Sequence, residues 1–242
     1  MNDIVQKFAV LGDIHANLEA LLAVLGDARE RGCTHFACVG DLVGYNANPR
    51  ECLDIVRRLG MSCVRGNHDE YAITDESLGA LNPRAAIAMY WTREQLAEPD
   101  KAWLRELRYV RVVAGFSLVH ATLDAPQRWG YVVDKLGAAA SFTYQSTSVC
   151  FYGHTHLPAI FVRNGSICQG VRPRLEITPG CKYLINVGSV GEPRDGNPLA
   201  SYVTYDLRER VVEFHRVAFD AEMTEAKVRE AGLPLRRRPV LA

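Results

Sequence analysis

Short apolar runs and segments with helix-spaced apolar positions alternate along the first 70 residues. The run Lys7–Leu11 predicts a strand, and an amphipathic segment follows it until Gly32. Asn17 is a good N-cap for the helix predicted there. Further strands are predicted at His35–Val39 and Ser62–Arg65, with a second amphipathic helix between them. Strands that alternate with such helices predict an α/β architecture with parallel strand pairing.

The pattern changes from helical to β-rich in the rest of the chain. The segment Gly79–Leu107 predicts mostly helix, and Pro83 is a suitable first helical residue. A last helix is expected from Asp220 to Gly232, and the region Arg163–Pro179 is expected to be loops or a hairpin excursion. The strands predicted between these helices are Val110–Val113, Phe116–Val119, Ser148–Tyr152, Ala159–Val162, Tyr183–Val187, Ser201–Tyr205 and Val211–Val217. This order predicts two sheets packed face to face with helices outside.

Length and composition are typical of one globular domain, which we expect to span residues 1–242. Apolar residues make up 48% of the chain and charged residues 23%, and the formal net charge is zero. This balance argues against disorder and against long-range attraction to nucleic acid or acidic membranes. No apolar run approaches the roughly 18 residues that span a bilayer. The N-terminal residues lack the zones of a signal peptide, so we expect a cytoplasmic protein without a membrane partner.

The cysteines fit the same compartment. The chain has 7 of them, without any C-x-x-C pair, and several lie inside apolar runs. We therefore expect mostly buried free thiols in a reducing cytoplasm, and neither a zinc knuckle nor a disulfide framework.

Five of the 7 histidines lie in short polar motifs, and each motif follows an apolar strand. A single D-x-H or G-D turn is common, because Asp and Gly favour turns. Five such turns in order, each supplying a carboxylate, imidazole or amide oxygen, indicate a metal site at the strand ends. The motifs are Asp13-x-His15, Gly40-Asp41, Gly66-Asn67-His68-Asp69, Val119-His120-Ala121 and Gly153-His154-Thr155-His156.

This series of motifs resembles the signature of the calcineurin-like metallophosphoesterases. The blocks D-x-H, G-D-x-x, G-N-H-[DE], a lone H and G-H-x-H all stand in order between Asp13 and His156. The segments Gly40–Tyr45, Gly153–Pro158 and Asn186–Pro198 resemble the small bacterial and archaeal phosphodiesterase-like branch. The resemblance covers most of the chain. It implies an α/β fold, a four-layer α/β/β/α sandwich of two mixed sheets flanked by helices, with two metals at one edge.

The resemblance also implies a role for each motif residue. Three side chains, Asp13, His15 and His156, would hold one metal. Asn67, His120 and His154 would hold the other, and Asp41 would bridge both. His68 would face the substrate without binding metal, with Asp69 beside or behind it, and we take both as catalytic candidates. Asn67 also counts as a substrate-binding candidate.

General chemistry explains these residue types. Two cations about 3.5–4 Å apart can clamp a phosphoryl group, and a bound metal lowers the pKa of water enough to supply a bridging hydroxide nucleophile. Mixed nitrogen and oxygen ligands suit two divalent transition metals, Mn first and also Fe, Zn or Ni, rather than Ca. His68 can protonate the leaving oxygen, because imidazole titrates near neutral pH.

Other residues carry weaker signals. Arg194 suits bidentate phosphate contact, but pairing with Asp195 or Glu192 would explain it equally well. The aromatic residues Tyr45, Trp129 and Tyr131 could stack on a base or aryl group, although packing is the simpler expectation. Asn46 stands where the branch commonly has a glycine. Because Asn tolerates left-handed backbone, we expect the same turn there.

The sequence thus predicts a dinuclear metal-dependent phosphoesterase that hydrolyses a small phosphodiester, nucleotide or dinucleoside polyphosphate. A phosphomonoesterase or protein phosphatase is the alternative, and a non-catalytic metal-binding scaffold is a further one, disfavoured because every ligand position is filled. A nuclease is disfavoured by the zero net charge. The expected partner is a small phosphate ester, and the oligomeric state is left open.

Overall fold

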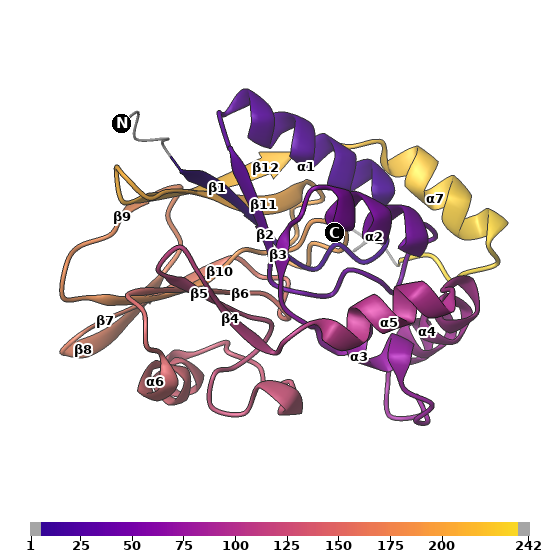
Figure 1. Cartoon of the computed structure of the whole chain (residues 1–242), viewed down its shortest axis with the longest axis horizontal. Coiled ribbons are helices and arrows are strands. Elements are labelled where there is room, and N and C mark those ends of the chain that lie inside the picture. Colours follow the sequence, from indigo (N-terminus) through magenta and orange to yellow (C-terminus); the bar gives the residue numbers. More distant parts are fainter. Residues whose placement is uncertain (1–5, 237–242) are drawn as a thin grey trace.

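Two six-stranded sheets pack face to face at the centre of the molecule (Figure 1). The structure is a computed structural model and describes residues 6–236. The first sheet has the order β3 (Ser62–Cys63), β2 (His35–Cys38), β1 (Lys7–Leu11), β11 (Ala200–Asp206), β12 (Val211–Val217) and β9 (Arg174–Glu176). The second has the order β4 (Val110–Val113), β5 (Phe116–Val119), β6 (Val149–Tyr152), β10 (Lys182–Asn186), β7 (Ala159–Asn164) and β8 (Ser166–Gly170).

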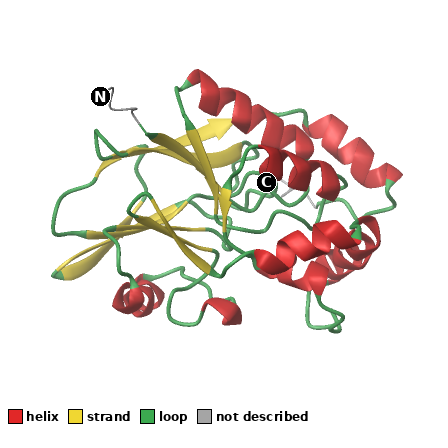
Figure 2. Ribbon diagram, viewed as in Figure 1, coloured by secondary structure: helices red, strands yellow, loops and turns green. Residues whose placement is uncertain are grey.

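Helices cover the outer faces and one end of this sandwich (Figure 2). Helix α1 packs on β11 and β12 of the first sheet, with α2 and α7 beside it, and α6 packs on β7, β8 and β10 of the second. A further group, α3 to α5, lies at one end. The bounds are α1 Leu18–Glu30, α2 Pro49–Arg58, α3 Asn67–Ile73, α4 Pro83–Gln95, α5 Glu98–Glu106, α6 Lys135–Tyr144 and α7 Ala221–Glu230, with a 3₁₀ turn at Pro126–Arg128. The predicted α/β/β/α sandwich of two mixed sheets is confirmed.

The apolar core between the sheets fixes how they face each other. Phe8 and Val10 point inward from the first sheet and meet Phe116, Phe151 and other inward residues of the second. The rings of Phe8 and Phe116 pack edge to face with centroids 5.1 Å apart. Strands β1, β2 and β3 run parallel, as do β5, β6 and β10. The carboxyl ends of both parallel groups therefore meet at one edge of the sandwich.

The predicted elements match the structure except in three places. The strand predicted at Ser62–Arg65 pairs only over two residues, and helix α3 begins directly at Asn67, where a turn was predicted. Helix α6 was missed. The region Arg163–Pro179 contains the β7–β8 hairpin, as one reading allowed, but its last part forms β9, which joins the other sheet.

The cysteines and the helix lengths bear on two of the expectations from the sequence. All seven cysteines are free, and six of them are buried, with Cys168 exposed. Across residues 6–236, no helix combines the length and apolar character needed to cross a membrane. Of the basic run near the C-terminus, Arg236 contacts the carbonyl of Pro193, while Arg237 and Arg238 lie outside the described residues.

Gly26 in the interior of α1 offers a test of local helix energetics. A Cβ at this position would meet no atom within 4 Å. We expect Gly26→Ala to raise the free energy of unfolding by about 0.5–1 kcal/mol, because alanine loses less backbone entropy in a helix. Urea unfolding measures this. The control is Gly191→Ala, whose Cβ would collide with the carbonyl oxygen of Ile14 and should destabilise the protein. A lower free energy of unfolding in Gly26→Ala would show that other atoms pack against this face of α1.

Candidate metal centre

The turns at the shared sheet edge bring six carboxylate and imidazole side chains together. One group contains Asp13, His15, Asp41 and His156, and the other contains Asp41, His120 and His154. Within each group the ligand atoms lie within 4.8 Å of one another, and all six side chains are buried. The amide of Asn67 completes the second group, since its Oδ1 lies 3.0 Å from Nε2 of His120. The structure therefore brings all seven ligands predicted from the sequence to one place.

Backbone carbonyl groups fix the orientation of four histidine rings. His15 contacts the carbonyl of Val43 through Nδ1 at 3.0 Å, and His120 contacts that of Val39 through Nδ1 at 2.9 Å. A carbonyl oxygen only accepts, so each ring donates an N–H there and turns its other nitrogen toward the cluster. The other two pairs are Nδ1 of His156 with the Glu192 carbonyl at 2.6 Å, and Nε2 of His154 with the Trp129 carbonyl at 2.9 Å. This is the arrangement that holds histidine ligands in metal sites.

The carboxylate of Asp41 lies between the two groups. Its Oδ2 is 3.5 Å from Nε2 of His15 and 3.4 Å from Nε2 of His120. Its Oδ1 accepts a hydrogen bond from the backbone N–H of His68 at 2.8 Å. Asp41 is the residue common to both groups, so one oxygen is placed where it can serve a cation on either side.

The electrostatics of the cluster favour the binding of cations. Burial lowers the pKa of His15 well below its usual range and that of His154 to about 3, so both rings are neutral. Burial acts to raise the pKa of Asp41, but His120 and His68 outweigh it and bring the pKa well below its usual range. For His120, burial is outweighed by the Asp41 carboxylate, which raises its pKa to about 9. The ionised carboxylate of Asp41 beside the neutral rings of His15 and His154 fits a divalent cation, and the raised pKa of His120 shows how strongly Asp41 favours positive charge here.

The ligand turns use backbone conformations that side-chain-bearing residues seldom adopt. The φ angles of Asp13, His15, Asp41, His154 and His156 lie between 49° and 66°, in the left-handed region. Small residues allow the close approach: a Cβ on Gly66 would collide with the Asp41 carboxylate, and one on Gly153 with the Asp13 carboxylate. Backbone strain is thus concentrated in the turns that orient the candidate ligands.

The two catalytic candidates of the third motif have different surroundings. The ring of His68 packs against the rings of His15 and Tyr45, with centroids 4.7 and 4.8 Å away, and its Nδ1 lies 3.2 Å from the sulfur of Met89. Burial lowers the pKa of His68 to about 4.

Asp69 is fully buried. Its carboxylate accepts hydrogen bonds from the backbone N–H groups of Asp41, Leu42 and Gly66, at 2.9, 2.8 and 2.9 Å. Burial, together with the charge of Asp41, raises the pKa of Asp69 to about 7, although these N–H groups oppose the shift. Asp69 thus lies behind the turns and holds them together.

Arg194 is free of the carboxylates that the sequence offered as partners. Asp195 pairs with Arg216, and Glu192 pairs with Arg84 through two hydrogen bonds. Arg194 is exposed and donates to the hydroxyl of Tyr45 at 3.2 Å. Its positive charge also contributes to the low pKa of His68.

Hydrogen bonds and backbone angles also decide the expectations for Asn17 and Asn46. Asn17 caps α1 through Ala20 N–H and donates to the Gly191 carbonyl, so its role is structural. The expected left-handed turn at Asn46 is wrong: the positive φ falls on Gly44 and Tyr45, and the Asn46 amide donates to the His15 carbonyl. The carbonyls that orient His154 and His156 were missed, because backbone atoms leave no side-chain signal.

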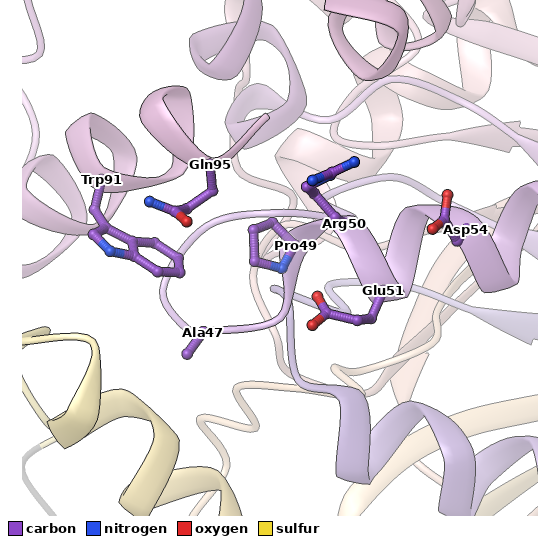
Figure 3. A pocket seen from close by; sticks show the side chains of 7 residues that line it. All are labelled: Ala47, Pro49, Arg50, Glu51, Asp54, Trp91 and Gln95. Atoms are coloured by element: carbon purple, nitrogen blue, oxygen red, sulfur yellow. The ribbon is translucent and has the colours of Figure 1, made fainter. Parts of the chain in front are cut away.

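A separate hollow of about 380 Å³ lies between the starts of α2 and the end of α4 (Figure 3). None of the ligand residues lines it. It is lined by Ala47, Pro49, Arg50, Glu51, Asp54, Trp91 and Gln95. Arg50 pairs with Asp100, and Glu51 accepts a hydrogen bond from Asn48. We place the chemistry at the histidine cluster, since the hollow holds neither of the two groups of candidate metal ligands.

Known proteins share this sequence and architecture. Residues 7–210 match the model of the calcineurin-like phosphoesterase superfamily domain. An uncharacterized protein of Methanocaldococcus jannaschii is 35% identical over 230 residues, 93% of either chain. The crystal structure of a metallophosphoesterase from Sphaerobacter thermophilus has 38% identity and a TM-score of 0.84 over 95% of both chains. A symmetrical bis(5'-nucleosyl)-tetraphosphatase of Aromatoleum aromaticum is 35% identical over 91 residues, 35% of this chain and 32% of that one. The chain belongs to the calcineurin-like phosphoesterase superfamily, a family of metal-dependent phosphoester hydrolases, and resembles its small bacterial and archaeal members.

Proposed function

We propose that the protein is a dinuclear metal-dependent phosphoesterase that hydrolyses a small phosphodiester, nucleotide or dinucleoside polyphosphate. The observation that carries the proposal is the pair of buried ligand groups that share Asp41. The first group would hold one divalent cation through Asp13, His15 and His156. The second would hold another through Asn67, His120 and His154. Mn²⁺ is our first choice, and Fe, Zn or Ni would suit the same nitrogen and oxygen donors.

Bound there, such cations supply charge for the phosphoryl oxygens and a hydroxide nucleophile at neutral pH. The chain's own residues do the rest. His68 is held by contacts with His15, Tyr45 and Met89, so it can present one ring nitrogen to a leaving oxygen without losing further freedom. The charge of an anionic ester would favour the protonated, donating form of this ring.

Two other candidates take different roles in this proposal. Arg194, which has no carboxylate partner among residues 6–236, would bind a phosphate oxygen with its exposed guanidinium. Asp69 would act as a positioning residue, because its carboxylate is enclosed by the N–H groups of the two turns that carry Asp41 and Asn67.

The substrate class rests on charge and on one relative. The net charge is zero, which disfavours long nucleic acids. The partial match to a symmetrical bis(5'-nucleosyl)-tetraphosphatase covers 35% of the chain and supports a nucleotide-type ester. A phosphomonoesterase or protein phosphatase remains the competing activity. The free thiols suit a reducing cytoplasm, where we place the protein.

Metal content and turnover test the proposal together. We expect chelation to abolish hydrolysis and Mn²⁺ to restore it. The panel is p-nitrophenyl phosphate, its bis ester, cyclic nucleotides, dinucleoside polyphosphates and a phosphopeptide. Asp41→Ala should lose both metals, and His154→Ala chiefly one, by elemental analysis. His35→Ala, which lies outside both groups, is the control and should keep both. Two full equivalents in Asp41→Ala, or full activity without metal, would contradict the mechanism.

The positioning role of Asp69 predicts that Asp69→Asn loses stability and metal affinity, although the two side chains are almost equal in size. In Asp69→Asn an amide N–H₂ must face at least one backbone N–H, so a donor is left without an acceptor. We expect the metal-free protein to lose about 1–3 kcal/mol of unfolding free energy. Metal affinity should weaken as well. Urea unfolding and metal titration measure both, with exposed Asp54→Asn as the neutral control. An unchanged Asp69→Asn protein would show that the three hydrogen bonds contribute nothing.

The donor role of His68 predicts a dependence on the leaving group. General acid catalysis is typically worth about 10²–10⁴-fold. His68→Ala should therefore lose a large factor on alkyl and nucleoside esters but little on nitrophenyl esters, which leave readily without a proton. Steady-state rates at saturating metal measure this, with elemental analysis showing both metals retained. Equal losses on all esters would indicate phosphate binding by His68, and loss of metal would make it a ligand.

A further inference from the structure

The surroundings of the cluster differ chemically between its two sides. Beside His15 and His68 lie Tyr45 and two guanidinium groups, those of Arg84 and Arg194, at 4.6 and 5.9 Å from the Tyr45 ring centroid. Glu192 neutralises Arg84, so on this side it is Arg194, without a carboxylate partner among residues 6–236, whose charge suits phosphate oxygens. The side beside His120 and His154 carries instead the aromatic rings of Tyr109, Trp129 and Tyr131.

Tyr131 is the exposed member of the aromatic side. One face of its ring stacks on His154, with centroids 4.3 Å apart and planes 25° from parallel. The side chain is nevertheless 60% exposed. Within residues 6–236 the His154 ring is the only ring that packs against Tyr131, and the Tyr131 hydroxyl makes no hydrogen bond. One face of the ring therefore covers a ligand histidine, and the rest of the side chain is open to solvent.

Trp129 and Tyr109 form an aromatic wall beside His120. Trp129 has a left-handed backbone, with φ of 54°, and its carbonyl accepts the hydrogen bond from His154. Its ring lies 5.9 Å from His120 and 5.8 Å from Tyr109, centroid to centroid. The hydroxyl of Tyr109 donates to Glu70 at 3.1 Å, which anchors that ring. The wall is thus ordered before any ligand binds.

We propose that Tyr131, on the aromatic side of the cluster, is a stacking subsite for the nucleobase of the substrate. The inference rests on the proposed function and assigns its substrate as a nucleotide-type ester. A base on the open face of Tyr131 would lie two stacking steps from His154, and the ribose would have to bridge this distance to a phosphate at the cluster. Other tyrosines such as Tyr144 are as exposed, but Tyr131 differs because its ring stacks on one of the candidate ligand histidines. Base stacking on an aromatic side chain is sequence-tolerant, so the subsite would accept any base.

The test separates the base from the phosphate. Two non-hydrolysable ligands, the methylene phosphonate analogues of adenosine 5′-phosphate and ribose 5-phosphate, are titrated into Mn²⁺-loaded protein by calorimetry. We expect the adenosine ligand to bind wild type about tenfold more tightly, which corresponds to about 1.4 kcal/mol. Tyr131→Ala should remove this advantage and leave the ribose ligand unchanged, while Tyr131→Phe keeps it. Tyr144→Ala, an equally exposed tyrosine on α6, is the matched control and should behave as wild type.

Each other outcome is decisive. Equal binding of both ligands to wild type would overturn the subsite and leave the phosphoesterase proposal standing. Equal weakening of both ligands in Tyr131→Ala, or lower metal content, would mean that the ring only supports His154. Arg194→Ala should weaken both ligands by a similar factor, since it would bind phosphate. If neither ligand binds metal-loaded wild type, the proposed function fails together with the subsite.

Discussion

The packing of the two sheets against each other is the contact on which the metal centre depends. The first sheet ends in Asp13, His15 and Asp41, and the second ends in the turns of His120 and His154. Hydrogen bonds cross between the sheets at the site itself, from His120 to the Val39 carbonyl and from the His154 N–H to the Asp13 carboxylate. Neither sheet holds a complete site alone, so the apolar core between them also sets the distances between ligands.

This dependence explains why the site tolerates strain. Left-handed backbone at residues with side chains costs of order 1–3 kcal/mol each. Such conformations persist only where the surroundings determine them, and here parallel strands anchor the start of each ligand turn. The same turns carry glycines packed against carboxylates, at Gly66 and Gly153. The stability of the sandwich therefore keeps the candidate ligand side chains in place before a cation binds. Binding then costs less conformational entropy.

Much of the site was predictable because its ligands are side chains in short local motifs. Asp13, His15 and Asp41 follow strands whose apolar runs are plain, and such strand ends meet in an α/β sheet. The parts that escaped prediction have no local signal. Strand β9 is mostly exposed and pairs with β12, far along the chain, and the carbonyls that orient His154 and His156 belong to irregular loops. For Arg194 the sequence left two interpretations open, and the structure removes pairing with Asp195 and Glu192, which pair elsewhere.

The same topology separates metal binding from substrate choice. The ligands sit at strand ends, where a shift of one residue would break the cluster, so their sequence is constrained by geometry. The loop from His120 to α6 delivers the Trp129 carbonyl to His154, and its rings at positions 129 and 131 pack against His120 and His154. Loops carried by a rigid scaffold are where binding specificity commonly resides. The exposed face of Tyr131 lies on such a loop, so the proposed subsite would select substrates without altering the strand ends that carry the candidate ligands.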